Sequence, residues 1–199
     1  MEQVERDVRA ACTAGDHAAA ATLALRGYGP EIYGFLAALH RGDADDVFAI
    51  FSASLWRGLP AFEWSCTLRT WAYTIARNTS NRFRRGERRT RAEIPLDEAS
   101  AVERLAHEIR TATRSYLRTE HRTKFAELRA SLPAEDQELL ILRVDRKLAW
   151  NELAIALADE PLAGRDLQRE AARLRKRFQL LKERLLELGR REGLLPAHD

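Results

Sequence analysis

Histidine and cysteine, the side chains that often carry catalysis or bind metals, are scattered along this sequence of 199 residues. The five histidines and two cysteines form no CxxC pair and no group at metal-ligand spacing. No histidine is paired with a candidate nucleophile, as a catalytic triad requires. No glycine-rich phosphate loop of the GxxxxGK(S/T) or GxGxxG type is present. We therefore predict that the chain is not an enzyme and has no catalytic residue, metal site or cofactor.

The arginines, in contrast, are concentrated. Residues 77–91 contain seven arginines and one glutamate, and residues 165–184 contain eight basic and three acidic side chains. Because the net charge of the whole chain is only +3, the remaining residues sum to −8. Two basic surfaces on an otherwise acidic chain are typical of two contacts with a polyanion such as nucleic acid. On charge alone, two solvated helix faces remain an alternative.

The C-terminal basic cluster follows a helix-turn-helix pattern. A short helix over residues 148–158 and a turn with Pro161 and Gly164 precede a long basic helix. In that second helix, residues at helical spacing predict a buried stripe of Leu167, Ala171, Leu174, Phe178, Leu181 and Leu185. The opposite face carries residue types that contact base edges in the major groove, namely Arg165, Gln168, Arg169, Ala172, Arg173 and Lys176. A charged coiled-coil face is the alternative.

The N-terminal basic cluster lies on a helix that begins near residue 68, after a cap at Ser65 or Thr67. Its apolar stripe is Leu68, Trp71, Ala72, Ile75, Ala76, Thr79 and Phe83, and the opposite face presents Thr70, Tyr73, Thr74, Arg77, Ser80, Asn81 and Arg84. The preceding loop contains Phe62 and Trp64. Arginines mixed with aromatic rings favour unstacked, single-stranded bases, and we expect Tyr73, Phe62 and Trp64 to stack on them. Trp71 is predicted to lie in the core.

Helices must position both clusters. Ala, Leu, Arg and Glu dominate, and no stretch alternates with period two, so the predicted fold class is all-α. We expect breaks at residues 27–30, 58–60, 95, 133 and 161–164, where Gly and Pro occur. Two amphipathic helices are predicted before residue 57, the second beginning in the acidic segment 43–46.

The domain organisation follows from the charge pattern. Residues 92–108 contain five carboxylates and one arginine, so we predict an acidic, partly helical linker over residues 92–121. This linker joins two small helical domains, residues 1–91 and 122–199. In the second domain we expect helices over residues 124–131, 134–145, 148–158 and 165–189.

Several strings resemble a known family. GDADDVF (42–48), LWRGLPAF (55–62) and LRTWAYTIARN (68–78) resemble the region 2 signature of sigma-70 family RNA polymerase sigma factors of the extracytoplasmic-function (ECF) group. LP (132–133), LLILR (139–143) and LAWNELA (148–154) resemble region 4 of that group. The resemblance covers residues 23–91 and 125–188, most of the chain.

The resemblance implies a role in transcription initiation, in which the first domain is region 2 and the second is region 4. A helix spanning residues 45–56 would dock on the β′ coiled coil of core RNA polymerase through Asp45, Asp46, Val47, Phe51, Leu55 and Trp56. The melted −10 element would be bound by Phe62, Trp64, Arg69, Tyr73, Arg77, Asn78, Asn81, Arg82, Arg84 and Arg85. The Leu139–Leu142 segment would meet the β flap, and the face with Arg165 to Lys176 would read the −35 element in duplex DNA.

The resemblance also implies that an anti-sigma factor holds the protein. No apolar run is long enough to span a membrane and no secretory signal begins the chain, so we expect a cytoplasmic protein without membrane insertion. The alternative function is a stand-alone helix-turn-helix transcriptional regulator. It would need only the second domain and would leave the helix after residue 68 without a purpose.

Overall fold

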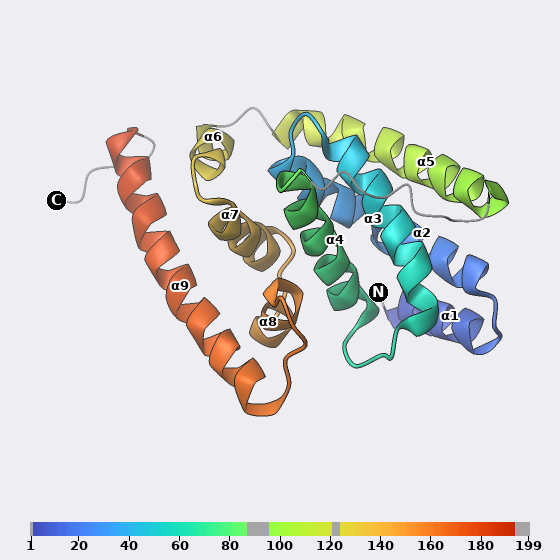
Figure 1. Cartoon of the computed structure of the whole chain (residues 1–199). Helices are drawn as coiled ribbons and strands as arrows, with labels where there is room; N and C mark the ends of the chain where they lie inside the picture. Colours follow the sequence, from blue (N-terminus) through green and yellow to red (C-terminus); the bar gives the residue numbers. More distant parts are fainter. Residues whose placement is uncertain (1, 87–95, 121–123, 194–199) are drawn as a thin grey trace. The chain divides into compact units, whose positions relative to one another are not determined.

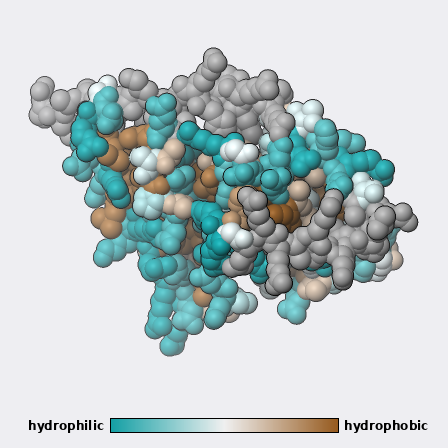
Figure 2. All heavy atoms as spheres, turned by 45° about the horizontal axis from the view of Figure 1, so that its top comes forward, coloured by the Kyte–Doolittle hydropathy of each residue, from teal (hydrophilic) through white to brown (hydrophobic). Residues whose placement is uncertain are grey.

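A computed structural model describes residues 2–86, 96–120 and 124–193, and every regular element in these ranges is a helix (Figure 1). The predicted all-α class is confirmed. The chain divides into two compact units, unit 1 from Met1 to Ser115 and unit 2 from Tyr116 to Asp199. In the view of Figure 2, hydrophilic residues cover most of the described surface.

Unit 1 is built around a long, largely buried helix, α2. Its elements are α1 (Glu2–Thr13), α2 (His17–Leu39), α3 (Ala44–Gly58), the 3₁₀ turn η1 (Leu59–Ala61), α4 (Leu68–Arg84) and α5 (Leu96–Glu120), the last of which belongs to unit 1 up to Ser115. Helices α1, α3 and α4 all pack on α2. Aromatic side chains fill the core between them, with Phe35, Phe48 and Phe51 fully buried.

Helix α2 runs without interruption through residues 27–30, where we expected a break. Pro30 lies inside the helix, although proline removes one backbone hydrogen bond there. Burial of residues on both sides of it, including Leu25 and Ile32, keeps the helix continuous. The glycines serve close packing: a Cβ atom at Gly29 would lie 2.8 Å from Cδ1 of Ile109 in α5.

The predicted linker needs a correction. Its described part is helix α5, and this helix has its own apolar stripe of Val102, Leu105, Ala106 and Ile109, all buried. Arg110 also donates a hydrogen bond to the backbone oxygen of Asp45 at 3.2 Å. The acidic residues Glu103 and Glu108 lie on the exposed face of this packed helix, and residues 96–115 belong to unit 1. Residues 92–95 and 121 lie outside the described ranges.

Unit 2 contains the four helical segments that the sequence predicts. They are α6 (Lys124–Ala130), α7 (Ala134–Leu140) continuing into the π-helical turn η2 (Ile141–Asp145), α8 (Trp150–Leu157) and α9 (Gly164–Arg191). The predicted stripe of α9 faces inward, because Ala171, Leu174 and Leu181 are buried. Leu181 packs with Leu132 and Leu140, and Phe178 and Leu185 cover this cluster. Gly164 begins α9 with a positive φ of 53°, which glycine adopts without steric cost.

Candidate nucleic-acid interface

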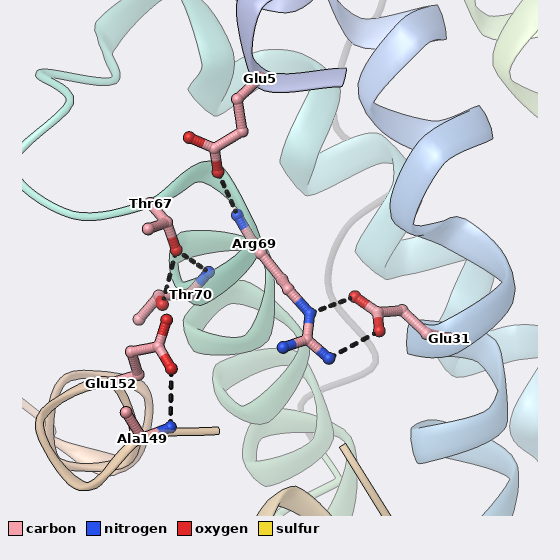
Figure 3. Close-up of polar contacts among 7 residues, drawn as sticks. All are labelled: Glu5, Glu31, Thr67, Arg69, Thr70, Ala149 and Glu152. Atoms are coloured by element: carbon pink, nitrogen blue, oxygen red, sulfur yellow. Dashed lines mark hydrogen bonds and ion pairs between the residues drawn. The ribbon is translucent and has the colours of Figure 1, made fainter. Parts of the chain in front are cut away.

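The start of α4 is fixed by a side-chain cap. The Thr67 hydroxyl accepts a hydrogen bond from the Thr70 backbone N–H at 3.1 Å, as Figure 3 shows. Of the two caps that the sequence allows, the structure has Thr67. A cap of this kind satisfies one of the unpaired amides of the first turn and fixes where the preceding loop joins the helix.

Arg69 is a correction to the predicted −10 residues. Its Nε and Nη2 atoms donate to the two carboxylate oxygens of Glu31 at 2.8 and 2.9 Å (Figure 3). The side chains are only 15% and 21% exposed. The backbone N–H of Arg69 also donates to the Glu5 carboxylate at 3.4 Å. Arg69 therefore joins α4 to α1 and α2 and is not an exposed DNA contact.

This polar cluster also includes a tyrosine of α2. Burial, followed by the negative charges of Glu5 and Glu31, raises the pKa of Tyr28 to about 12. The phenol consequently stays neutral and hydrogen-bonds the Glu5 side chain. The sequence offers no signal for this cluster, because its members lie on three helices far apart in the chain.

Tyr73 is a second correction, since its side chain is 0% exposed. Its ring packs edge-on against Phe35, with ring centroids 5.7 Å apart. Thr70 and Ser80, expected on the same polar face, are also buried. The reason is that α4 contacts both α2 and α3, so its buried arc is wider than the apolar stripe. Tyr73 is thus a core residue and not a stacking platform.

Two aromatic rings of the loop before α4 form a contiguous group with Trp71 of α4. Phe62 is 9% exposed and stacks on Trp71, with ring centroids 4.6 Å apart and planes inclined by 21°. Trp64 is half-buried and lies against Phe62 at 4.9 Å. Of the two predicted stacking residues of this loop, Trp64 is therefore the more exposed, and Phe62 packs beneath its ring. Trp71, predicted as core, is half-buried because it forms the base of this stack.

The last turns of α4 form the basic surface of unit 1. Arg82, Arg84 and Arg85 are exposed, and Arg77, Asn78 and Asn81 are half-buried. Arg84 donates a hydrogen bond to the Asn81 side chain. Arg88, Arg89 and Arg91, which contribute to the predicted basic cluster, lie outside the described residues.

A buried histidine supports this end of α4. His40, just after α2, makes a hydrogen bond with the Ser80 hydroxyl at 2.7 Å and packs edge-on against Phe83. Burial, followed by the positive charge of Arg84, lowers the pKa of His40. His40 is therefore neutral at neutral pH.

The predicted polymerase-binding residues of α3 divide into two groups. Val47, Phe51, Leu55 and Trp56 are buried, a correction to their expected role as contact residues. Asp45 is half-buried and accepts a hydrogen bond from the Tyr33 hydroxyl at 2.9 Å, whereas Asp46 is exposed. The outward face of α3 instead consists of Asp46, Ile50, Ala53 and Arg57, of which Ile50 and Ala53 are half-buried.

In unit 2, the predicted outward face of α9 is exposed along its whole length: Arg165, Gln168, Arg169, Ala172, Arg173 and Lys176. The Arg169 and Arg173 side chains are 78% and 70% exposed. Each lies near an acidic neighbour one turn earlier, Asp166 for Arg169 and Glu170 for Arg173. Exposed pairs of this kind are weak, so they hold the two arginine side chains only loosely.

The flank of α9 differs from the outward face. Arg177 donates to Asp136 at 2.7 Å and to Glu135 at 2.8 Å, and its side chain is 33% exposed. Arg177 therefore ties α9 to the start of α7. At the start of α8, the backbone N–H of Ala149 donates to the Glu152 carboxylate at 2.7 Å (Figure 3). This contact fixes the start of α8.

The predicted β-flap contact in unit 2 also needs a correction. Leu139, Leu140, Ile141 and Leu142 are all buried. These side chains form part of the core of unit 2, so any flap contact must use neighbouring exposed residues.

Comparison with known families supplies the deciding observation. Residues 25–90 match the family Sigma-70 region 2. The match supports a sigma-70 family sigma factor. No curated protein and no solved structure matches the chain.

The region 2 match begins inside α2 and contains the cap, the aromatic loop and the basic end of α4. Helices α1 and α5 lie outside it. Region 2 implies binding to core RNA polymerase and promoter DNA, and the family is not catalytic. Within the described residues, no group of three or more potential ligands has the geometry to hold a metal ion. Across the same ranges, no helix combines the length and the apolar composition needed to span a membrane.

Proposed function

We propose that the chain is a transcription initiation factor of the ECF group. It binds core RNA polymerase and directs it to promoters by contacting a melted −10 element through unit 1 and a duplex −35 element through unit 2. An anti-sigma factor is the proposed regulator, on the strength of the resemblance alone.

This proposal rests on the region 2 match, because the matched residues include an aromatic ring and exposed arginines that suit single-stranded DNA. Within residues 25–90, the half-buried ring of Trp64 lies at one end of α4 and the exposed Arg82 at the other. An aromatic platform binds an unstacked base, and arginines neutralise the phosphates of the same strand. Asn78, half-buried between these ends, is suited to hydrogen-bond a base edge.

The −35 function rests on α9. Its outward face combines Arg169 and Arg173 with Gln168, and a recognition helix commonly meets base edges with its N-terminal residues. Arginine contacts guanine in a bidentate manner, and glutamine contacts adenine. Arg177, held by Asp136, is then a structural residue of unit 2 and makes no −35 contact.

Core polymerase binding is assigned to the outward face of α3. Asp46 is exposed and Ile50 is half-buried, a polar and apolar combination typical of the edge of a protein interface. We expect Asp46→Lys to weaken co-purification with core polymerase. Glu2→Lys makes the same charge change at a 94% exposed carboxylate of α1 and serves as the control.

The first experiment separates this function from a stand-alone regulator. The purified chain is tested for promoter-specific transcription and duplex DNA binding, with and without core polymerase, on genomic DNA fragments. A sigma factor should produce defined transcription starts only with core. Specific duplex binding by the chain alone, with no core-dependent starts, would favour the regulator.

The second experiment tests the −10 surface by two variants. Asn78→Ala should weaken initiation in a way that depends on the −10 bases, since it removes a base contact. Arg82→Ala should weaken initiation equally on all −10 sequences and lower the salt dependence by about one phosphate contact. If Asn78→Ala costs every promoter the same, this residue does not read bases.

A further inference from the structure

The backbone of Trp64 adopts an unusual conformation. Its φ is 58°, in the left-handed region that bulky residues rarely occupy. Such a conformation persists only where surrounding contacts hold it, and it is often found at functional sites. The contacts of Trp64 therefore indicate what maintains the loop.

One of these contacts comes from helix α1. The Arg9 guanidinium lies over the Trp64 ring, with Cζ 4.4 Å from the ring centroid. Phe62 packs against the same indole at 4.9 Å and is itself stacked on Trp71. A guanidinium above an indole is a favourable cation–π arrangement. Arg9 precedes the region 2 match, which begins at residue 25.

Helix α1 presents Arg9 from a fixed position. Its Val4 side chain fills the space above Gly27 of α2, where a Cβ atom would lie 2.5 Å from Val4 Cγ1. Val8 is fully buried. Glu5, one turn before Arg9 and so on the same face, accepts the Arg69 backbone N–H at the start of α4. The helix is thus anchored on α2 and on the start of α4.

We propose that Arg9 is a positioning residue that holds Trp64 in the orientation in which the loop binds an unpaired base. The proposal rests on the proposed function of the loop in single-stranded DNA binding. Arg9 orders one face of the loop before DNA binds, so the loop loses less conformational entropy on binding. In this arrangement the base contacts Trp64. Arg9 does not touch the base and affects binding only by holding the indole ring of Trp64.

The test measures the full-length chain with and without DNA. Amide hydrogen exchange of residues 62–67 reports loop order in the free protein, and fluorescence anisotropy with a labelled mixed-sequence single-stranded 20-nucleotide DNA reports affinity. Arg9→Ala should speed exchange in the loop and weaken DNA binding by about three- to tenfold, the factor that one cation–π contact supplies. Arg9→Lys, which retains a cation, should recover most of both losses.

Two controls separate positioning from other roles. Arg6→Ala removes the same charge from a side chain of α1 that is 66% exposed, and it should leave loop exchange unchanged. In a Trp64→Ala background, Arg9→Ala should have no further effect on affinity.

Three results would overturn the proposal. They are unchanged loop exchange in Arg9→Ala, tighter DNA binding by it, and an equal loss in the Trp64→Ala background, which would mean that Arg9 contacts DNA directly. If Trp64→Ala itself leaves affinity unchanged, the proposed function of the loop fails, and loop exchange alone decides whether Arg9 holds Trp64.

Discussion

Arg69→Met is the most direct test of whether the half-buried ion pair between Arg69 and Glu31 is structural. The variant keeps the aliphatic stem but removes both hydrogen bonds to Glu31, of 2.8 and 2.9 Å. Removing one partner of a fully buried pair costs about 3–5 kcal/mol, because the other charge remains buried without compensation. Since the two side chains are 15% and 21% exposed, water can partly solvate the remaining carboxylate. We therefore expect a loss of about 2–3 kcal/mol in the free energy of unfolding.

Urea unfolding followed by tryptophan fluorescence measures this loss in unit 1. Trp56, Trp64 and Trp71 all lie in unit 1, and Trp150 lies in unit 2. With a slope of about 1–3 kcal/mol per molar urea, the midpoint should fall by about 0.7–3 M. The exposed Arg26 provides the control, since Arg26→Met should change the free energy by no more than about 0.5 kcal/mol.

A second substitution distinguishes an ion pair from simple packing. Adding Glu31→Gln to Arg69→Met removes the uncompensated charge, so the double variant should be less destabilised than the sum of the two single variants. Normal stability of Arg69→Met together with weakened binding of single-stranded DNA would refute this reasoning. That outcome would mean that Arg69 contacts DNA, as the sequence predicts.

Two further predictions concern packing and protonation. Gly29→Ala should destabilise unit 1 by about 1–2 kcal/mol, because overpacking against Ile109 exceeds the gain in helix propensity. The cost should fall in an Ile109→Val background, which lacks the Cδ1 atom 2.8 Å from the new Cβ, and full additivity would argue against this contact. For His40, the lowered pKa means that the unfolded chain binds a proton before the folded chain does. Stability should therefore be fully present above about pH 6.5 and be lost as the pH falls below it. His40→Gln should flatten this part of the curve in thermal unfolding at several pH values, and an unchanged slope would contradict the assignment.

The sequence predicted the elements that carry local signals. Thr67 precedes an apolar run and is a good capping residue, so the start of α4 was predictable. In α9 the apolar stripe is regular, and the polar face is exposed as the helical period requires. The order of the last two helices was predictable for the same reason, since the short helix α8, a turn with Gly164 and the basic helix α9 follow one another directly.

The features that depend on neighbours were not predictable. A helical period gives the direction of the buried face but not its width, and Tyr73 lies in the part that α2 and α3 cover together. Arg69 has the residue type and position of a DNA contact, and nothing near it in the sequence indicates a partner 38 positions away in Glu31. Similarly, the apolar residues of α5 had the right spacing for a helix, but the acidic composition favoured a linker. The contacts of α5 with Gly29 and with the backbone of Asp45 assign this helix to unit 1.

The packing of α5 bears on where a fragment of unit 1 should end. A fragment ending at Arg91 would lack Ile109. It would expose to water the surface of α2 that Ile109 covers and leave the space beside Gly29 unfilled. A fragment beginning at residue 25, where the region 2 match starts, would also lose the first turns of α2 and the whole of α1. The compact unit is consequently longer at both ends than the segment that matches Sigma-70 region 2, and it extends from α1 to about Ser115.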